Sequence, residues 1–245
     1  MKNNTKIHTP FLQIMFFLLI GFFILTFQAC SSGDDEEDDE KENVTQTLLP
    51  NGNYEINGHE AVDLGLSVKW ATCNVGASTP ESIGGYYAWG ETFTKDSYTW
   101  DNYTWLDAIN GKFIKYGEWY CVLKSSDDVA TVKWGKGWRM PTKEEIDEFV
   151  TSCTKTAVHG KVYIDGKYRT RTIGYNIVGP SGKSIYLPCS GYYVDTELKS
   201  TTSGAYFWSS SGDSDDNARM YDSFWSNCAH THFKNSGLPI RPVAD

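Results

Sequence analysis

The sequence predicts an α+β fold in which short strands and one or two helices form a single domain. Three observations predict it: aromatic side chains make up 15% of the 245 residues, the apolar runs are short and broken by Gly, and helical periodicity is confined to one region. Aromatic and β-branched residues favour strands, and strands followed by helices and then more strands are typical of α+β domains. The share of hydrophobic residues, 40%, is ordinary for a globular chain.

One segment carries clear helical signals. In Pro141–Val150, Thr142 can cap the helix, Glu145 stands three residues later as in a capping box, and Ile146 and Phe149 share one face. A second, shorter helical turn is expected over Ser126–Val132. Strands are expected within Glu60–Ala71 and then over Lys161–Ile164, Thr170–Val178, Ser184–Leu187, Tyr206–Ser210, Ala218–Trp225 and Leu238–Val243.

The N-terminus predicts export from the cytoplasm. Lys2 and Lys6 precede an apolar run over Ile14–Leu25, and Ala29-Cys30 follows it, which is the order of charged, apolar and small residues in a signal peptide. The longer stretch Phe11–Phe27 approaches the length of a membrane-spanning helix, so an uncleaved anchor is the alternative. Both alternatives place the rest of the chain outside.

Ala29-Cys30 also resembles the lipobox of bacterial lipoproteins, although Phe27 departs from the small or aliphatic residue usual at its position. The resemblance implies cleavage before Cys30 and its acylation. The acidic run Asp34–Glu40 resembles the surface-export tag of Bacteroidetes-type lipoproteins, and a self-repelling spacer is the alternative. We therefore expect a lipoprotein signal peptide over residues 1–29, an acidic flexible tether over 30–52 and the folded domain over 53–245. The chain would be lipid-anchored in the outer membrane and exposed at the cell surface.

The net charge of −9 is concentrated in that tether. Residues 34–42 hold eight acids and one lysine, whereas residues 43–245 carry a net charge of only −4. A domain of that charge has no excess of basic residues for phosphate contacts, so nucleic acid is not an expected partner.

Several separated motifs resemble the Fibrobacter succinogenes major paralogous domain family. They follow the family's order from about Glu60 to Val243 and include Val62–Ala77, Tyr87–Thr92, Asp127–Ala130, Trp134–Thr142, Leu187-Pro188, Gly191-Tyr192, Phe207–Ser211 and Pro239–Val243. The resemblance implies a C-type-lectin-like fold, related to sulfatase-modifying domains, in a surface lipoprotein. It supplies no ligand or catalytic residue, because fold does not fix function. Trp70, Trp89, Trp138 and Trp208 belong to these motifs and are expected to be structural.

Aromatic residues outside the core are the candidates for ligand binding. Trp119, Tyr120, Tyr192 and Tyr193 could stack on sugar rings or on another protein, and Trp119 and Tyr120 lie outside the family motifs. The function expected is surface-anchored, non-catalytic recognition of a glycan or of another surface protein. The alternatives are a structural or accessory subunit of a surface assembly and, third, an enzyme of the sulfatase-modifying type.

Two segments could hold a metal ion, although no cofactor is required. Asp213, Asp215 and Asp216 form a loop of oxygen ligands suited to calcium, and a solvated acidic turn is the alternative. His230 and His232 alternate with Cys228, so on a strand all three would share the face needed for zinc, and a polar strand face is the alternative.

Catalytic motifs are weak. The sequence has neither a Gly-x-Ser-x-Gly elbow nor a His-Glu-x-x-His helix. Sulfatase-modifying enzymes use paired reactive cysteines, but Cys189 and Cys228 lack the surrounding pattern, so the chain is not expected to be an enzyme. Once Cys30 is set aside, five cysteines remain (Cys73, Cys121, Cys153, Cys189 and Cys228), and their spacing does not determine any pairing.

Overall fold

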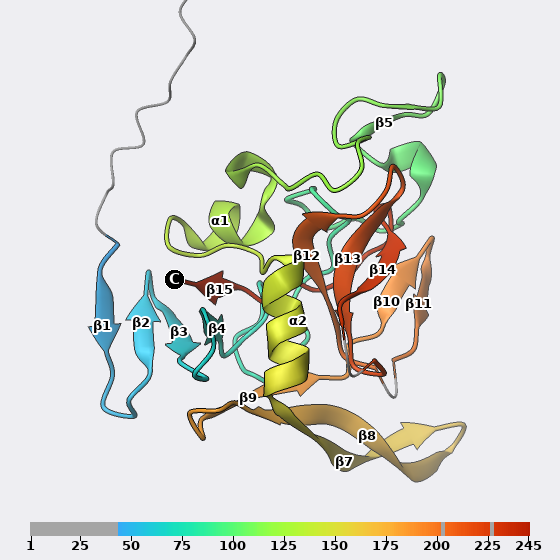
Figure 1. Ribbon diagram of the computed structural model, residues 1–245. Coiled ribbons are helices and arrows are strands. Elements are labelled where there is room, and N and C mark those ends of the chain that lie inside the picture. The colour runs from blue at the N-terminus through green and yellow to red at the C-terminus, as the bar shows by residue number, and fades with distance from the viewer. Residues whose placement is uncertain (1–43, 202–203, 226–227) are drawn as a thin grey trace, which may run out of the picture. The chain divides into compact units, whose positions relative to one another are not determined.

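The computed structural model describes residues 44–201, 204–225 and 228–245, and consists mostly of antiparallel sheets with two short α-helices (Figure 1). This agrees with a small α+β or mainly β fold. The predicted signal peptide and Cys30 lie outside the described residues. Within the described ranges, no helix is long and apolar enough to cross a membrane.

The largest sheet joins the two ends of the folded part. Its order is β1 (Gln46–Leu48), β2 (Tyr54–Ile56), β3 (His59–Val62), β4 (Lys69–Ala71) and β15 (Val243–Ala244). All neighbours are antiparallel, and β15 pairs Val243 with Trp70. β1 lies inside the stretch predicted as tether, so folded structure begins before residue 53. All three residues of Gln46–Leu48 are exposed and they show no apolar alternation, so hydrophobic periodicity does not predict this strand.

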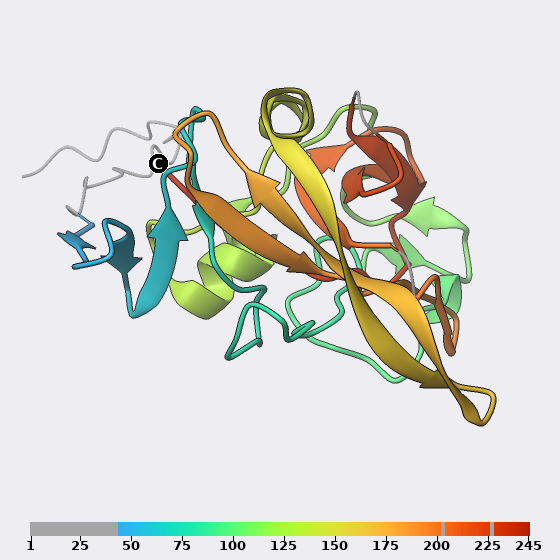
Figure 2. The same ribbon diagram turned by 90° about the horizontal axis from the view of Figure 1, so that it is seen from below.

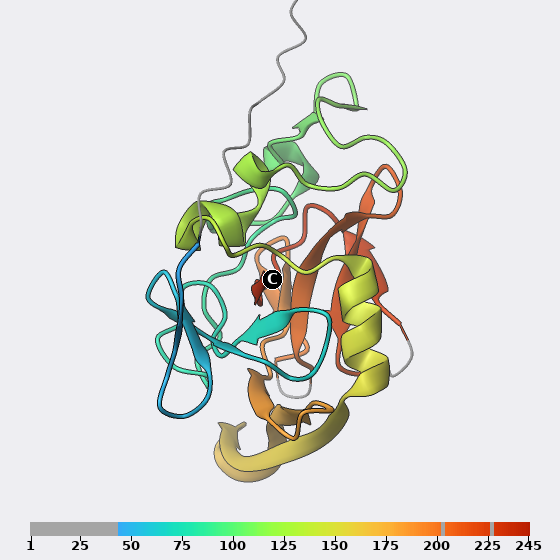
Figure 3. The ribbon, with the colours of Figure 1, turned by 60° about the vertical axis from the view of Figure 1, so that its left-hand side comes forward.

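The two helices follow each other in the middle of the chain. A 3₁₀ turn, η2 (Ser125–Asp127), leads into α1 (Val129–Trp134), where the Asp128 side chain accepts from Thr131 N at 3.0 Å. α2 (Lys143–Ser152) has the predicted capping box of Thr142 and Glu145, and it buries Ile146 and Phe149. Figure 3 shows α2 lying beside the sheet formed by β12 (Tyr206–Gly212), β13 (Asn217–Asp222) and β14 (His230–Phe233). The predicted helix is confirmed.

Two short ribbons and a turn complete this half of the domain. They are η1 (Trp100–Asn102), β5 (Leu106–Asp107) paired with β6 (Lys112–Phe113), and β10 (Tyr192–Val194) paired with β11 (Glu197–Lys199). The strand predicted over Leu238–Val243 is wrong for most of its length: the segment is buried, but it makes only isolated bridges before β15. Its apolar residues fill the core without joining a continuous ladder.

A long hairpin projects from the domain. β7 (Thr154–Ile164) pairs with β8 (Lys167–Val178) over its whole length, whereas β9 (Ser184–Pro188) pairs only with Gly174–Val178. Seen from below, the hairpin tip lies at the opposite end of the domain from β1 (Figure 2). Both strands are longer than predicted, because most of the added residues are exposed and few of them are apolar.

The predicted structural role of four tryptophans is confirmed by their burial, since Trp70, Trp89, Trp138 and Trp208 are at most 1% exposed. Three of their indoles donate to backbone carbonyls: Trp89 to Ser209, Trp138 to Ile56 and Trp208 to Tyr87, at 2.8 to 2.9 Å. These bonds connect segments more than 80 residues apart, so the tryptophans hold the strands and helices together as well as filling the core.

Candidate functional site

A strongly exposed aromatic pair lies in the loop 113–124, which we call the aromatic loop. Trp119 and Tyr120 are 64% and 71% exposed, and their rings meet edge to face with centroids 6.0 Å apart. The same loop lines a cavity of about 530 Å³, formed by residues 113–118 and by Cys121, Val122 and Lys124. Small-molecule sites usually have volumes of roughly 300–1,000 Å³, so the cavity is large enough for a sugar residue.

The aromatic loop is held in an uncommon backbone conformation. Tyr116 and Tyr120 have φ of 60° and 57°, a region that side chains other than Gly rarely adopt and that costs about 1 kcal/mol or more. The Tyr116 hydroxyl donates to the Asp127 carboxylate and accepts from Lys124 N at 3.0 Å. Such strain persists only where the surroundings enforce it, and it is frequent at binding loops.

Asp127 anchors the base of the aromatic loop through charge. Its carboxylate pairs with Lys115, whose ammonium lies 4.7 Å from the Trp105 ring centroid. Burial raises the pKa of Asp127, but the hydrogen bonds from Lys115 and Tyr116 outweigh it, so the pKa lies below its ordinary value. Asp127 is therefore ionised at neutral pH and keeps both partners in place.

Lys234 connects the aromatic loop to the predicted calcium turn. Its side chain is fully buried, and its ammonium donates to the carbonyl oxygens of Tyr116, Ser214 and Asp215 at 2.8, 2.7 and 2.9 Å. An ammonium has three donors, and all three are used. Burial lowers the pKa of Lys234, and the three nearby aspartates oppose that shift.

The acidic turn directs its oxygens to partners within the protein. Asp213 forms an ion pair with Arg219, and Asp216 accepts from Asn217 at 2.6 Å and from Ser214 at 3.0 Å. The backbone carbonyl oxygens of residues 214 and 215, which could have been calcium ligands, accept hydrogen bonds from the Lys234 ammonium instead. Across the described residues, no three His, Cys, Asp or Glu side chains gather as a metal site.

The predicted zinc face is divided between two aromatic environments. His230 stacks on Trp225 with ring centroids 4.7 Å apart, whereas His232 packs edge-on against Tyr192 at 4.6 Å. The Nδ1 atom of His232 accepts from Phe233 N, and burial lowers the pKa of its imidazole. Both histidines lie on β14, and their rings act as packing groups.

Tyr192 and Tyr193 are half-buried and belong to different clusters. Tyr192 packs against Tyr206 with centroids 5.0 Å apart, and Tyr193 stacks on Tyr98 at 5.5 Å. Neighbouring residues on a strand face opposite sides of the sheet. The four aromatic residues expected to bind ligand are therefore not one surface: Trp119 and Tyr120 are open, and the two tyrosines of β10 are part of the packing.

The five cysteines of the described residues form no disulfide. Cys189 is buried, and burial raises the pKa of its thiol to about 11. Burial and the charge of Glu148 raise the pKa of Cys153 to about 11 as well. Reactive cysteines need a lowered pKa, so both thiols are in environments of the opposite kind.

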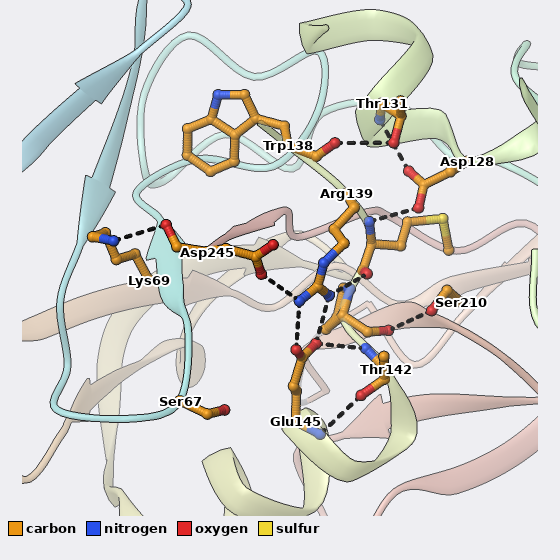
Figure 4. A network of polar contacts seen from close by, with 12 residues as sticks. Ser67, Lys69, Asp128, Thr131, Trp138, Arg139, Thr142, Glu145, Ser210 and Asp245 are labelled. Carbon is orange, nitrogen blue, oxygen red and sulfur yellow. Dashed lines mark hydrogen bonds and ion pairs between the residues drawn. The ribbon is translucent and has the colours of Figure 1, made fainter. Parts of the chain in front are cut away.

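The Trp-Arg-Met-Pro-Thr motif supports the fold through a polar network (Figure 4). Arg139 holds Glu145 with two hydrogen bonds of 2.8 and 2.6 Å and reaches Asp245 at 2.8 Å. Lys69 donates to the backbone carbonyl of Asp245 at 2.8 Å. The motif thus ties the start of α2 to the C-terminal strand, which is a structural role.

A second cavity is lined by residues of α2, β7, β8 and β13 and by Trp225. It measures about 270 Å³ and is lined mainly by apolar side chains, among them Phe149, Ile177 and Trp225. The ammonium of Lys155 at its rim donates to the Ser223 carbonyl. It is smaller than most ligand sites and its charged group already has a partner, so the aromatic loop is the better candidate.

Sequence reasoning missed Lys234 and the backbone strain of the aromatic loop. A single lysine does not form a recognisable motif, and a positive φ at a tyrosine cannot be predicted from the residue type. Comparison of the chain with protein-family models, with curated proteins and with solved structures finds no match.

Proposed function

We propose that this chain is a lipoprotein of the outer membrane, anchored through Cys30 and exposed at the cell surface, whose folded part recognises a glycan without catalysis. The observation that carries the proposal is the exposure of Trp119 and Tyr120 beside a cavity of about 530 Å³. Aromatic faces stack on the C–H faces of sugar rings, and a loop held by Asp127 and Lys234 presents them with little loss of conformational entropy on binding.

We also propose the finer fold, a C-type-lectin-like domain of the Fibrobacter succinogenes major paralogous type. The ordered motifs between Glu60 and Val243 support it, and so does the burial of the motif tryptophans. Recognition without a metal cofactor is proposed because Arg219 pairs with Asp213 and the Lys234 ammonium is bonded to the carbonyl oxygens of Ser214 and Asp215. The raised thiol pKa values of Cys153 and Cys189 argue against transfer of the sulfatase-modifying activity.

A protein partner is the second candidate, because apolar residues gather around the same loop. Ile109, Ile114 and Val122 are 95%, 68% and 58% exposed. Exposed apolar patches mark protein interfaces, so the loop could equally dock on a subunit of a surface assembly.

A glycan array of neutral oligosaccharides, screened with the full chain in non-ionic detergent, tests the first candidate. We expect at least one ligand, bound equally with calcium and with EDTA, and a loss of about 10-fold or more in affinity for Trp119→Ala or Tyr120→Ala. Phe93→Ala is the matched control, because Phe93 is 49% exposed but lies outside the loop. Equal losses in all three variants would contradict a glycan site at the loop. Retention of the binding after Ile109→Ser, at a residue outside the cavity lining, would separate it from an apolar protein interface.

A further inference from the structure

The distal part of the β7–β8 hairpin, residues 159–172, is a basic ribbon that we call the arm. It holds four Lys or Arg and one Asp, a net charge of +3, whereas the rest of residues 44–245 holds 15 basic and 22 acidic side chains, a net charge of −7. The arm extends beyond β9, which pairs with β8 only from Gly174 onward. At about 3.3 Å per residue, six residue pairs reach roughly 20 Å.

Three cations lie in a row on one face of the arm. The register pairs Arg171 with Gly160, Arg169 with Val162 and Lys167 with Ile164, and paired residues point to the same face. Alternate residues of a strand are about 7 Å apart, so the three charges form a regular line. All three side chains are exposed, and within the described residues none forms an ion pair.

A low apolar strip runs beside this cation row. Val162 and Ile164 are half-buried, and Gly160 adds no side chain. On this face of the arm, β7 therefore offers apolar contacts and β8, beside it, offers cations. A pyranose polymer has matching chemistry, with C–H faces for the apolar strip and acidic substituents at regular intervals for the cations.

The aromatic residues of the arm lie on its other face. Tyr163 pairs with Tyr168, their ring centroids 5.1 Å apart, and both are exposed. Proteins that bind single-stranded nucleic acid combine stacking residues and cations along one groove. On the tyrosine face of the arm Lys161, which pairs with Thr170, is the one cation, so a strand stacked on the tyrosines would leave most of its phosphates away from the row of three. The separation therefore favours an acidic sugar polymer over a nucleic acid strand.

We propose that the cation row of Lys167, Arg169 and Arg171 binds a linear acidic polysaccharide, through carboxylate or sulfate groups. The arm tip lies at the opposite end of the domain from β1, where the folded part begins (Figure 2). A chain anchored on the β1 side would therefore present the arm outward. The proposal does not depend on the aromatic loop, so one of the two proposed binding surfaces can be disproved without affecting the other.

The test measures binding of the full chain, in non-ionic detergent, to polygalacturonate, heparin and neutral dextran. We expect binding to at least one acidic polymer and none to dextran, with a loss of about 10-fold or more between 50 and 200 mM NaCl. The triple variant Lys167→Gln, Arg169→Gln, Arg171→Gln is expected to lose at least about 10-fold in affinity. Its melting temperature should stay unchanged, because the three side chains are exposed.

A second triple variant removes the same charge elsewhere. Lys112→Gln, Lys133→Gln and Lys199→Gln change exposed residues outside the arm and outside the cavity of the aromatic loop, and should leave acidic-polymer binding within about twofold. Equal losses in the two triple variants would show that net charge, not the row, is responsible and would overturn the proposal. So would failure of both acidic polymers to bind. Tighter binding to single-stranded DNA or to phosphatidylglycerol vesicles, with the same dependence on the row, would assign the arm to that partner instead.

Discussion

The tryptophans of the folded part differ in what surrounds their indole rings. Trp208 is fully buried and donates to the Tyr87 carbonyl, whereas Trp119 is 64% exposed on the aromatic loop. Sequence context predicted both outcomes, because Trp208 belongs to an ordered set of motifs and Trp119 does not. It could not predict the half-burial of Tyr192 and Tyr193, since their packing partners Tyr206 and Tyr98 come from other parts of the chain.

Removing the buried indole should destabilise the fold. Trp208→Ala is expected to lower the free energy of unfolding by about 3–5 kcal/mol, because it leaves a cavity and an unpaired carbonyl. Trp119→Ala is the matched control and should change it by less than about 0.5 kcal/mol. Urea denaturation of both variants measures the difference. A Trp208→Ala protein with wild-type stability would show that the core does not depend on this indole.

The partly buried imidazole of His232 gives a pH dependence of known sign. Burial lowers its pKa in the folded state, so the unfolded chain takes up a proton first as the pH falls. Its contribution to stability is complete above the unfolded pKa of about 6.5 and is lost as the pH falls through it. His232→Gln should therefore lose less stability than wild type between pH 7.5 and 5.5. His159→Gln, at an exposed position, should follow the wild-type curve; parallel curves for all three proteins would contradict the assignment.

At the scale of elements, signals within a short stretch of sequence predicted α2. The bounds of the strands depend instead on pairing with other segments of the chain. The capping box and the spacing of Ile146 and Phe149 are contained in ten residues, so the helix was visible in the sequence. β1 and the first part of β7, residues 154–160, consist mainly of exposed residues and form because a neighbouring strand pairs with them. For the apolar segment 238–243 the sequence predicted a strand where most residues form none. A segment can be buried in the core without pairing in a continuous ladder.

The cap of α2 should be measurable by itself. The Thr142 hydroxyl accepts from Glu145 N at 3.2 Å, so Thr142→Ala should lower the free energy of unfolding by about 1 kcal/mol. Thr142→Ser keeps the acceptor and should recover most of that loss. Thr170→Ala, on the exposed arm, controls for the loss of a threonine hydroxyl. Chemical denaturation compares the three, and a Thr142→Ala protein as stable as the Thr142→Ser protein would contradict the role of the cap.

At the scale of the whole molecule, the proposed lipid anchor can be tested directly. If Cys30 is acylated, Cys30→Ala should abolish incorporation of a fatty-acid probe and leave a slower-migrating precursor in the membrane. Cys228→Ala is the control, because Cys228 is an exposed cysteine of the folded part and lies far beyond the lipobox. Metabolic labelling followed by electrophoresis measures both effects. Equal labelling of the Cys30→Ala protein and the wild type would remove the lipid anchor from the proposed function.

The folded domain has two proposed ligand surfaces, the aromatic loop and the cation row of the arm, and salt should affect binding to them differently. The aromatic loop offers Trp119 and Tyr120, whose stacking contacts are little affected by salt, whereas the cation row of the arm acts through charges that salt screens over about 10 Å at 0.1 M. Between 50 and 200 mM NaCl, the affinity for a neutral oligosaccharide should change by less than about twofold, and that for an acidic polymer should fall by about 10-fold or more. Trp119→Ala should weaken only the first and the triple substitution of the cation row only the second. Titrations of both ligands at both salt concentrations measure this. If one set of substitutions abolished both kinds of binding, the molecule would have one ligand surface rather than two.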